Sequence, residues 1–99
     1  MKIVSGIQIG QYVRSKAGRD KNHIFLVLEI IDHEYVLLVD GDSRRIEKPK
    51  KKKIKHLYEY RQISDVVREK KTDDKKLTNL MIRKEIEKFD VNLNNLGGF

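Results

Sequence analysis

A concentrated run of basic side chains at residues 43–56 is the part of this sequence with the clearest chemical meaning. The run reads SRRIEKPKKKKIKH and holds two Arg, six Lys and one Glu, so it carries +7, which equals the net charge of the whole 99-residue chain. The single Glu47 cannot pair with four consecutive lysines, and a bound polyanion would relieve their mutual repulsion. Lysine is a compact charge that suits phosphates, so the run favours nucleic acid over a solvated edge strand or a nuclear localisation signal.

A second basic segment lies at residues 14–22 and reads RSKAGRDKN. Gly18 allows the backbone to turn sharply, which crowds Lys16, Arg19 and Lys21 at the tip of a loop. These side chains and the neighbouring backbone amides can meet phosphate oxygens. Charged loops are also common on small domains, so this segment taken alone fits a solvated loop equally well.

The residue types that catalysis needs do not come together in this sequence. A zinc site needs three converging ligands, but His23, His33 and His56 lie far apart and the chain has no Cys. Asp40 and Asp42 flank a glycine and have the composition of a turn. The sequence also lacks a phosphate-binding loop, a dinucleotide-binding glycine pattern and a nucleophile elbow. We therefore expect a protein that is not an enzyme and that binds neither a metal nor a cofactor.

Short β-strands are predicted to position the two basic segments. HIFLVLEII at 23–31 and YVLLV at 35–39 are strand-like runs joined by a polar triplet that suits a tight antiparallel connection. Both faces of these strands are apolar, which indicates a sheet that curls on itself or is covered by a helix. Further strands are expected at 10–17, from 44–47 onwards and at 53–60. Five short strands within the first 60 residues favour a small SH3-like or OB-like barrel.

The last third of the chain is predicted to be helical. Ser64 can cap a short helix of about two turns. A clearer helix is expected over 75–90, with Thr78 as its N-cap and Leu77 packed onto Ile82. The apolar stripe of this second helix is narrow, so we expect the stripe to dock on the barrel.

The sequence thus predicts three parts: a barrel at residues 1–60, a helical extension packed on the barrel at 61–91, and a flexible tail at 92–99. The N-terminus lacks the apolar stretch of a secretory signal, and no apolar run approaches the roughly 18 residues of a membrane span. Without cysteine the chain makes no demand on the redox environment. We expect a soluble, cytoplasmic protein without a membrane partner.

The two basic segments also resemble a known family. GQYV at 10–13 followed by SKAGRDK at 15–21 resembles the KOW motif, a strand, glycine-bearing loop and strand found in RNA-binding SH3-like barrels. VDGDSRR at 39–45, KPKKKK at 48–53 and KHL at 55–57 resemble the bacterial KOW-domain proteins that are related to large-subunit ribosomal proteins of archaea and eukaryotes. Those relatives are the families named fourteen-e, six-e and twenty-seven-e.

The resemblance covers about residues 8–57 and implies an SH3-like barrel. With the helical pattern after residue 61, we expect a mainly β fold, a small five-stranded SH3-like (KOW) barrel followed by one or two short C-terminal helices. The resemblance also implies a non-catalytic protein that binds structured RNA, such as ribosomal RNA, and is associated with the ribosome or with translation. The expected RNA-binding residues are Arg14, Lys16, Gly18, Arg19, Lys21, Arg44, Arg45, Lys48, Lys50, Lys51, Lys52, Lys53, Lys55 and His56.

Two other functions fit the sequence. The barrel and the helices could dock another protein in translation or transcription, with the lysines acting as a non-specific nucleic-acid anchor. Binding to duplex DNA shares the electrostatics, but residues 79–89 mix acidic and basic side chains and lack the basic face of a recognition helix. RNA binding is therefore the leading prediction.

Overall fold

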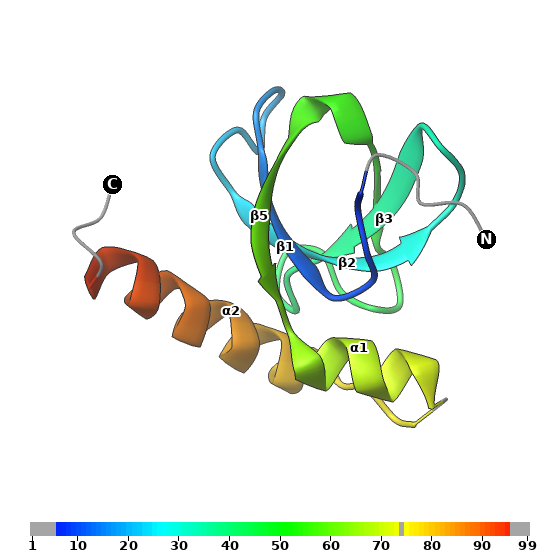
Figure 1. Ribbon diagram of the computed structural model, residues 1–99, viewed down its shortest axis with the longest axis vertical. Helices are drawn as coiled ribbons and strands as arrows, with labels where there is room; N and C mark the ends of the chain where they lie inside the picture. The colour runs from blue at the N-terminus through cyan, green and yellow to red at the C-terminus, as the bar shows by residue number, and fades with distance from the viewer. Residues whose placement is uncertain (1–5, 74, 96–99) are drawn as a thin grey trace.

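The computed structural model describes residues 6–73 and 75–95 of the chain. Five strands are followed by two α-helices (Figure 1). The elements are β1 (Gln11–Ser15), β2 (Ile24–Ile30), β3 (Tyr35–Val39), β4 (Lys50–Lys53), the 3₁₀ turn η1 (Ile54–His56), β5 (Leu57–Ile63), α1 (Asp65–Thr72) and α2 (Asn79–Asn95). The predicted mainly β fold with C-terminal helices is confirmed.

The strands form one antiparallel sheet in the order β4-β3-β2-β1-β5, so the last strand returns beside the first. Pairing irregularities interrupt the β1–β5 ladder after Gln11 and the β2–β3 ladder after Val27. Bulges of this kind increase local twist and bend a sheet. Among the described residues no ladder joins β4 to β5, so the sheet is open and the closed barrel stays a prediction.

The predicted fourth strand was placed too early in the chain. Residues 44–47 are not extended, and β4 is the lysine run itself, Lys50–Lys53. The Asp40 carboxylate accepts hydrogen bonds from the backbone N–H of Arg44, and the Asn79 side chain accepts one from Ile46. These two backbone N–H groups are therefore already hydrogen-bonded and cannot pair with a neighbouring strand. The predicted fifth strand likewise begins later, at Leu57, because η1 intervenes.

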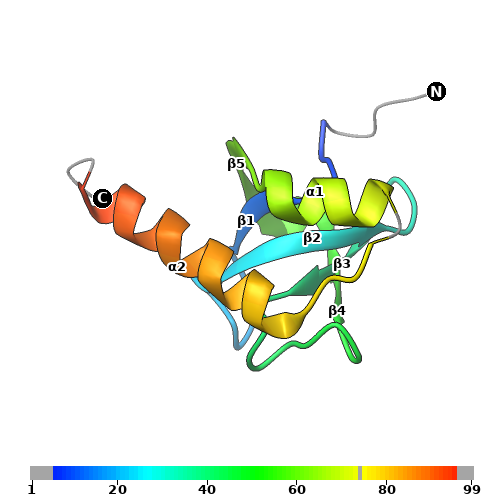
Figure 2. The same ribbon diagram turned by 90° about the horizontal axis from the view of Figure 1, so that it is seen from below.

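Both faces of the sheet are buried, which explains the two-sided apolar pattern of the sequence. In β2, Phe25 and Val27 belong to one hydrophobic core, while Leu26 and Leu28 belong to a second core on the other face. The second core is completed by side chains of both helices, including Val67 and Ile82 and Phe89. Figure 2 shows the two helices crossing this outer face of the sheet.

The helix starts follow the predicted caps. Ser64 accepts the N–H of Val67 at the start of α1, and Thr78 accepts the N–H of Met81 at the start of α2. The predicted end of the second helix was wrong, because α2 continues to Asn95 through residues 92–95 that were expected to be tail. Residues 96–99 of that tail lie outside the described residues.

A close approach at Gly41 fixes α2 against the sheet. Gly41 has φ +79°, and a Cβ at this position would lie 2.4 Å from the backbone oxygen of Asn79 at the start of α2. The Tyr12 hydroxyl donates to the backbone oxygen of Glu85, and the Tyr12 ring stacks on Phe89 with centroids 4.1 Å apart. Aromatic stacking and backbone contact thus hold α2 across β1 and β2.

Replacing Gly41 with Ala tests this close approach. Gly41→Ala should lower the free energy of unfolding by about 3 kcal/mol, because a clash with α2 adds to the cost of a positive φ. Gly6→Ala is the matched control, since Gly6 has φ +76° but nothing lies within 4 Å of the added carbon. The control should cost only about 1 kcal/mol. Urea unfolding measures both, and equal losses would show that the approach to α2 is unimportant.

Candidate nucleic-acid interface

The loop between β1 and β2 is a tight, internally bonded structure. The Ser15 hydroxyl donates to the Asp20 carboxylate at 2.7 Å, and the backbone N–H of Asn22 donates to the backbone carbonyl oxygen of Ser15. Gly18 and Asn22 adopt positive φ, which lets the chain reverse direction within residues 16–23. Gly18, Arg19 and Lys21 are exposed at its tip, as the sequence predicts.

Lys52 joins this loop to β4. Its ammonium donates to the backbone oxygen of Ala17 at 2.9 Å and to the Asp20 carboxylate at 3.0 Å. The Lys50 ammonium lies 3.4 Å from the other oxygen of Asp20. The two basic segments that the sequence singled out, at residues 14–22 and 43–56, therefore lie side by side. We call this contact the Lys52 junction.

The lysines of β4 are not equivalent, although the sequence treated them as one set. Lys52 is 9 % exposed and its ammonium is hydrogen-bonded inside the protein, so it links β4 to the β1–β2 loop and does not face solvent. The sequence interpretation that these lysines lack partners missed Asp20, which pairs with Lys50 and Lys52 from a distant loop. The side chains of Lys51 and Lys53 point to the opposite face of β4, where their ammonium nitrogens lie 4.5 and 5.9 Å from the centroid of the Tyr35 ring.

The Asp20 carboxylate is strongly stabilised in its charged form. Burial by itself would raise its pKa, but hydrogen bonds from Ser15 and Lys52, with the charges of Lys52 and Lys50, lower the pKa to about 2. Asp20 is therefore ionised throughout the neutral and mildly acidic range. Its charge allows a lysine to be nearly buried in a segment that is otherwise strongly basic.

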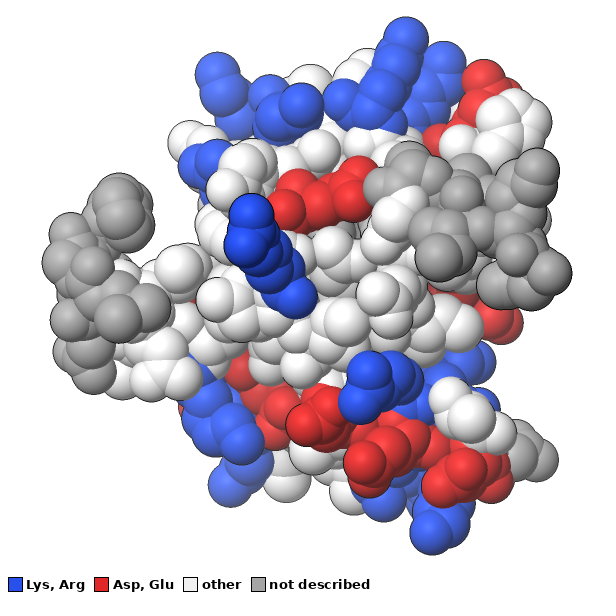
Figure 3. All heavy atoms as spheres, in the orientation of Figure 1, with Lys and Arg blue, Asp and Glu red and all other residues white. Residues whose placement is uncertain are grey.

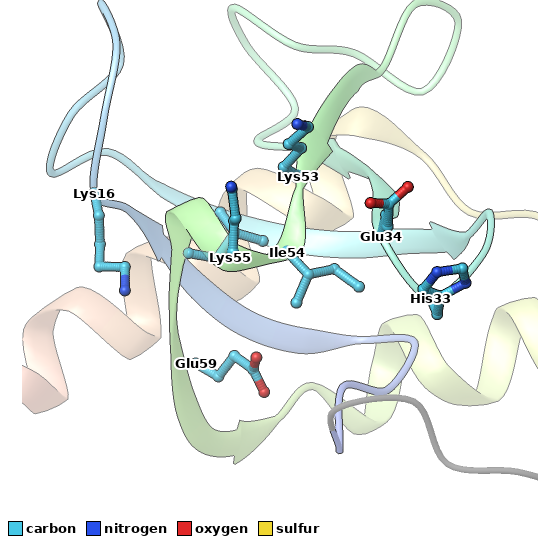
Figure 4. A pocket seen from close by; sticks show the side chains of 8 residues that line it. Lys16, His33, Glu34, Lys53, Ile54, Lys55 and Glu59 are labelled. Carbon is cyan, nitrogen blue, oxygen red and sulfur yellow. The ribbon is translucent and has the colours of Figure 1, made fainter.

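Three lysines surround a hollow beside η1. Lys16, Lys53 and Lys55 line a cavity of about 360 Å³, whose apolar part is formed by Ile54 and Leu57. His33, Glu34 and Glu59 complete the lining. Figure 4 shows Lys53 and Lys55 pointing the same way from the β4–η1 segment, while Lys16 extends toward Glu59. Burial raises the pKa of Glu59, and the charge of Lys16 opposes that rise. We call this hollow the lysine pocket.

A second depression lies beside the Lys52 junction, where Asp20 forms part of its wall. Arg19, Arg44 and Lys50 line it together with His23. Asp40 sits behind this group, and its carboxylate lies 2.8 Å from the ring nitrogen of His23. Burial would raise the pKa of Asp40, but hydrogen bonds from Ser43, from the backbone N–H of Arg44 and Asp42, and from His23 lower it. Asp40 therefore holds the 40–44 turn as an ionised carboxylate.

The remaining predicted site residues differ in exposure. Lys21, Arg45, Lys48 and Lys51 are exposed and His56 is half-buried. The Arg14 guanidinium lies over the ring of Tyr58 of β5, 5.0 Å from the ring centroid. Figure 3 shows basic side chains gathered at the end of the molecule that carries the β1–β2 loop and η1 in Figure 1. At the opposite end, over α1, acidic and basic side chains are mixed.

Sequence reasoning missed Asp20, Glu59 and Tyr58. The register would have found Tyr58, because it lies directly opposite Arg14 in the β1–β5 ladder. Asp20 was visible only as one acidic residue within a basic loop, and Glu59 as one charge in a mixed segment.

In the described part of the chain, no group of three or more His, Cys, Asp or Glu side chains is arranged to hold a metal ion. No described helix has the length and apolar character needed to cross a membrane. No protein-family model matches the chain, and no curated protein matches it. The arguments for function therefore rest on the geometry and charge of the site.

Changing the charge of Asp20 tests the Lys52 junction. The pKa of Asp20 lies below its ordinary value of 3.8, so its stabilising effect is complete above about pH 4 and is lost as the pH falls toward 2. Asp20→Asn should therefore lower the free energy of unfolding by about 2 kcal/mol at pH 7, and by progressively less below pH 4. Asp90→Asn on the exposed side of α2 is the control and should change little. A loss for Asp20→Asn that stayed constant from pH 7 to pH 2.5 would contradict the assignment.

Proposed function

We propose that this chain is a non-catalytic RNA-binding protein that binds structured RNA, such as ribosomal RNA, through its paired basic segments. The observation that carries the proposal is the Lys52–Asp20 junction, which places the β1–β2 loop beside β4 and η1. Around this junction, none of Lys16, Arg19, Lys51 and Lys55 forms an ion pair with another described residue. Their charge is available to an external polyanion.

Phosphate is the chemistry that this surface fits best. Most of the available groups are lysines, which act as point charges and do not distinguish one base from another. Binding through them releases condensed counterions, so affinity should be high at low salt and should fall steeply as salt increases. The partner is then selected mainly by shape, as is usual for double-helical RNA.

RNA fits better than duplex DNA. DNA-binding motifs commonly place a helix in the major groove. Here α2 carries Arg83, Lys84, Glu85, Glu87 and Lys88 in alternation, and its inner side is buried against the sheet. The resemblance of both basic segments to KOW-domain proteins points in the same direction. On this proposal the protein acts in the cytoplasm, as a ribosomal component or as a factor of translation.

A protein-binding role for α2 is the second candidate. Leu80 and Val91 on this helix are large apolar side chains that are 52 % and 56 % exposed. If α2 docks a translation or transcription protein, serine at both positions would weaken association with that assembly and leave the affinity for naked RNA unchanged. If the lysine surface is the functional one, the serine variant would bind ribosomal particles as the parent does.

Two matched triple variants test the leading proposal. Lys16, Lys51 and Lys55 are exposed at the basic end, and Lys75, Lys76 and Lys84 are exposed elsewhere. Changing the first three to Gln should weaken binding to a ribosomal RNA hairpin at least about tenfold and reduce the slope of log affinity against log salt by about 2 to 3. Changing the second three removes the same charge and should have little effect. Equal losses in both variants would refute a localised RNA surface.

A further inference from the structure

A groove beside β5 has a different chemical character from the lysine surface. It has a volume of about 590 Å³ and is lined by Arg14, Tyr58, Glu59, Tyr60, Arg61 and Leu93. These residues come from β1, β5 and the C-terminal part of α2, which extends away from the sheet on the β5 side (Figure 1). The volume lies within the usual range for sites that take small organic groups. We call this hollow the β5 groove.

The β5 groove contains a partly exposed stacking surface. Arg14 and Tyr58 face each other in the β1–β5 ladder, with the guanidinium 5.0 Å from the ring centroid. The Tyr58 ring is also held by Tyr60. The two rings meet edge-on with their centroids 4.9 Å apart, and the Tyr60 ring in turn makes an edge contact with Phe89. Tyr58 is nevertheless 46 % exposed. A ring that is held in place and still open to solvent is suited to stack on a flat ligand.

The Arg14 guanidinium keeps one nitrogen, Nε, free of hydrogen bonds to the described part of the protein. This nitrogen is buried and has no hydrogen-bond partner among the described residues. Buried donors normally have a hydrogen-bond partner, so an unpaired one needs an explanation. The contact that holds this guanidinium in place is its stacking on the Tyr58 ring. Arg61 is exposed at the same groove and supplies a further positive charge.

The β5 groove adjoins the lysine pocket, because Glu59 lines both. Lys16 lines the lysine pocket together with Glu59, and Arg14 and Tyr58 line the β5 groove together with Glu59. A nucleic-acid backbone held by the lysines would therefore carry its next nucleotides toward the stacked pair. The carboxylate between the two hollows can accept hydrogen bonds from the amino groups of a base.

We propose that the β5 groove binds an unpaired RNA base, stacked on the Arg14–Tyr58 pair, beside the structured RNA held at the lysine pocket. This inference rests on the proposed RNA-binding function and extends it. The ligand is a duplex or hairpin that continues into a single-stranded segment, since only an unpaired base can leave its stack to enter the groove. Aromatic and guanidinium stacking tolerates different bases, so the groove should favour unpaired over paired RNA without reading a defined sequence.

Three RNA molecules that share one hairpin separate stacking from charge. The first is blunt, the second carries four unpaired adenosines, and the third carries four abasic nucleotides with the same phosphates. The wild type should bind the adenosine RNA about fivefold to a hundredfold more tightly than the abasic RNA. Tyr58→Ala should abolish this difference and Tyr58→Phe should retain it.

The outcomes distinguish this inference from the function on which it rests. The Lys16, Lys51 and Lys55 triple Gln variant should lose affinity for all three RNAs and keep the preference for adenosine. If the wild type binds all three with no preference for bases, the groove assignment is overturned and the RNA-binding function stands. If none of the RNAs binds, both are overturned, and the β5 groove is better assigned to a protein partner.

A second measurement does not depend on a variant that folds. RNA whose unpaired segment carries 4-thiouridine can be crosslinked to the wild-type protein by ultraviolet light, and mass spectrometry then locates the crosslinked peptide. The peptide that contains Tyr58 should carry the crosslink. Crosslinks confined to the lysine run, or to the first half of α2 around Leu80, would overturn the assignment, whereas a crosslink near Leu93 would agree with it because Leu93 lines the groove. An unchanged unfolding midpoint in Tyr58→Ala would show that its binding defect is local.

Discussion

The nearly buried ammonium of Lys52 is the constraint on which the basic end of this protein depends. A buried charge is tolerated only with opposite charge and hydrogen-bond acceptors around it, and here Asp20 and the Ala17 carbonyl supply them. The β1–β2 loop must therefore close over β4. Once it does, the exposed cations of both segments share one surface, and the lysine pocket forms next to η1.

Local signals in the sequence predicted local structure well. The β-branched and aromatic runs of β2 and β3, and the caps Ser64 and Thr78, act within a few residues, so each is legible from the chain itself. Hydrogen bonds between residues that are far apart in the sequence could not be predicted from it. The backbone N–H of Arg44 is held by Asp40 and that of Ile46 by Asn79 at the start of α2, and this displaced the predicted fourth strand.

The candidate site shows the same division. The sequence located both basic segments, because charge runs are visible in any fold. The sequence could not show that Asp20 pairs with Lys50 and Lys52 and leaves the other lysines of the run without this partner. It also could not show that Arg14 stacks on Tyr58. Both facts depend on strand register and on loop closure. The β5 groove also requires α2 to extend past its predicted end, since Leu93 forms part of its wall.

Backbone amide shifts recorded while a ribosomal RNA hairpin is titrated into the labelled protein test the central claim most directly. The account predicts that the largest changes fall within residues 16–21 and 50–56, on the two sides of the Lys52 junction, and that the exposed side of α2 is unaffected. Changes that clustered on α2 around Leu80 and Val91, with the basic segments silent, would contradict it.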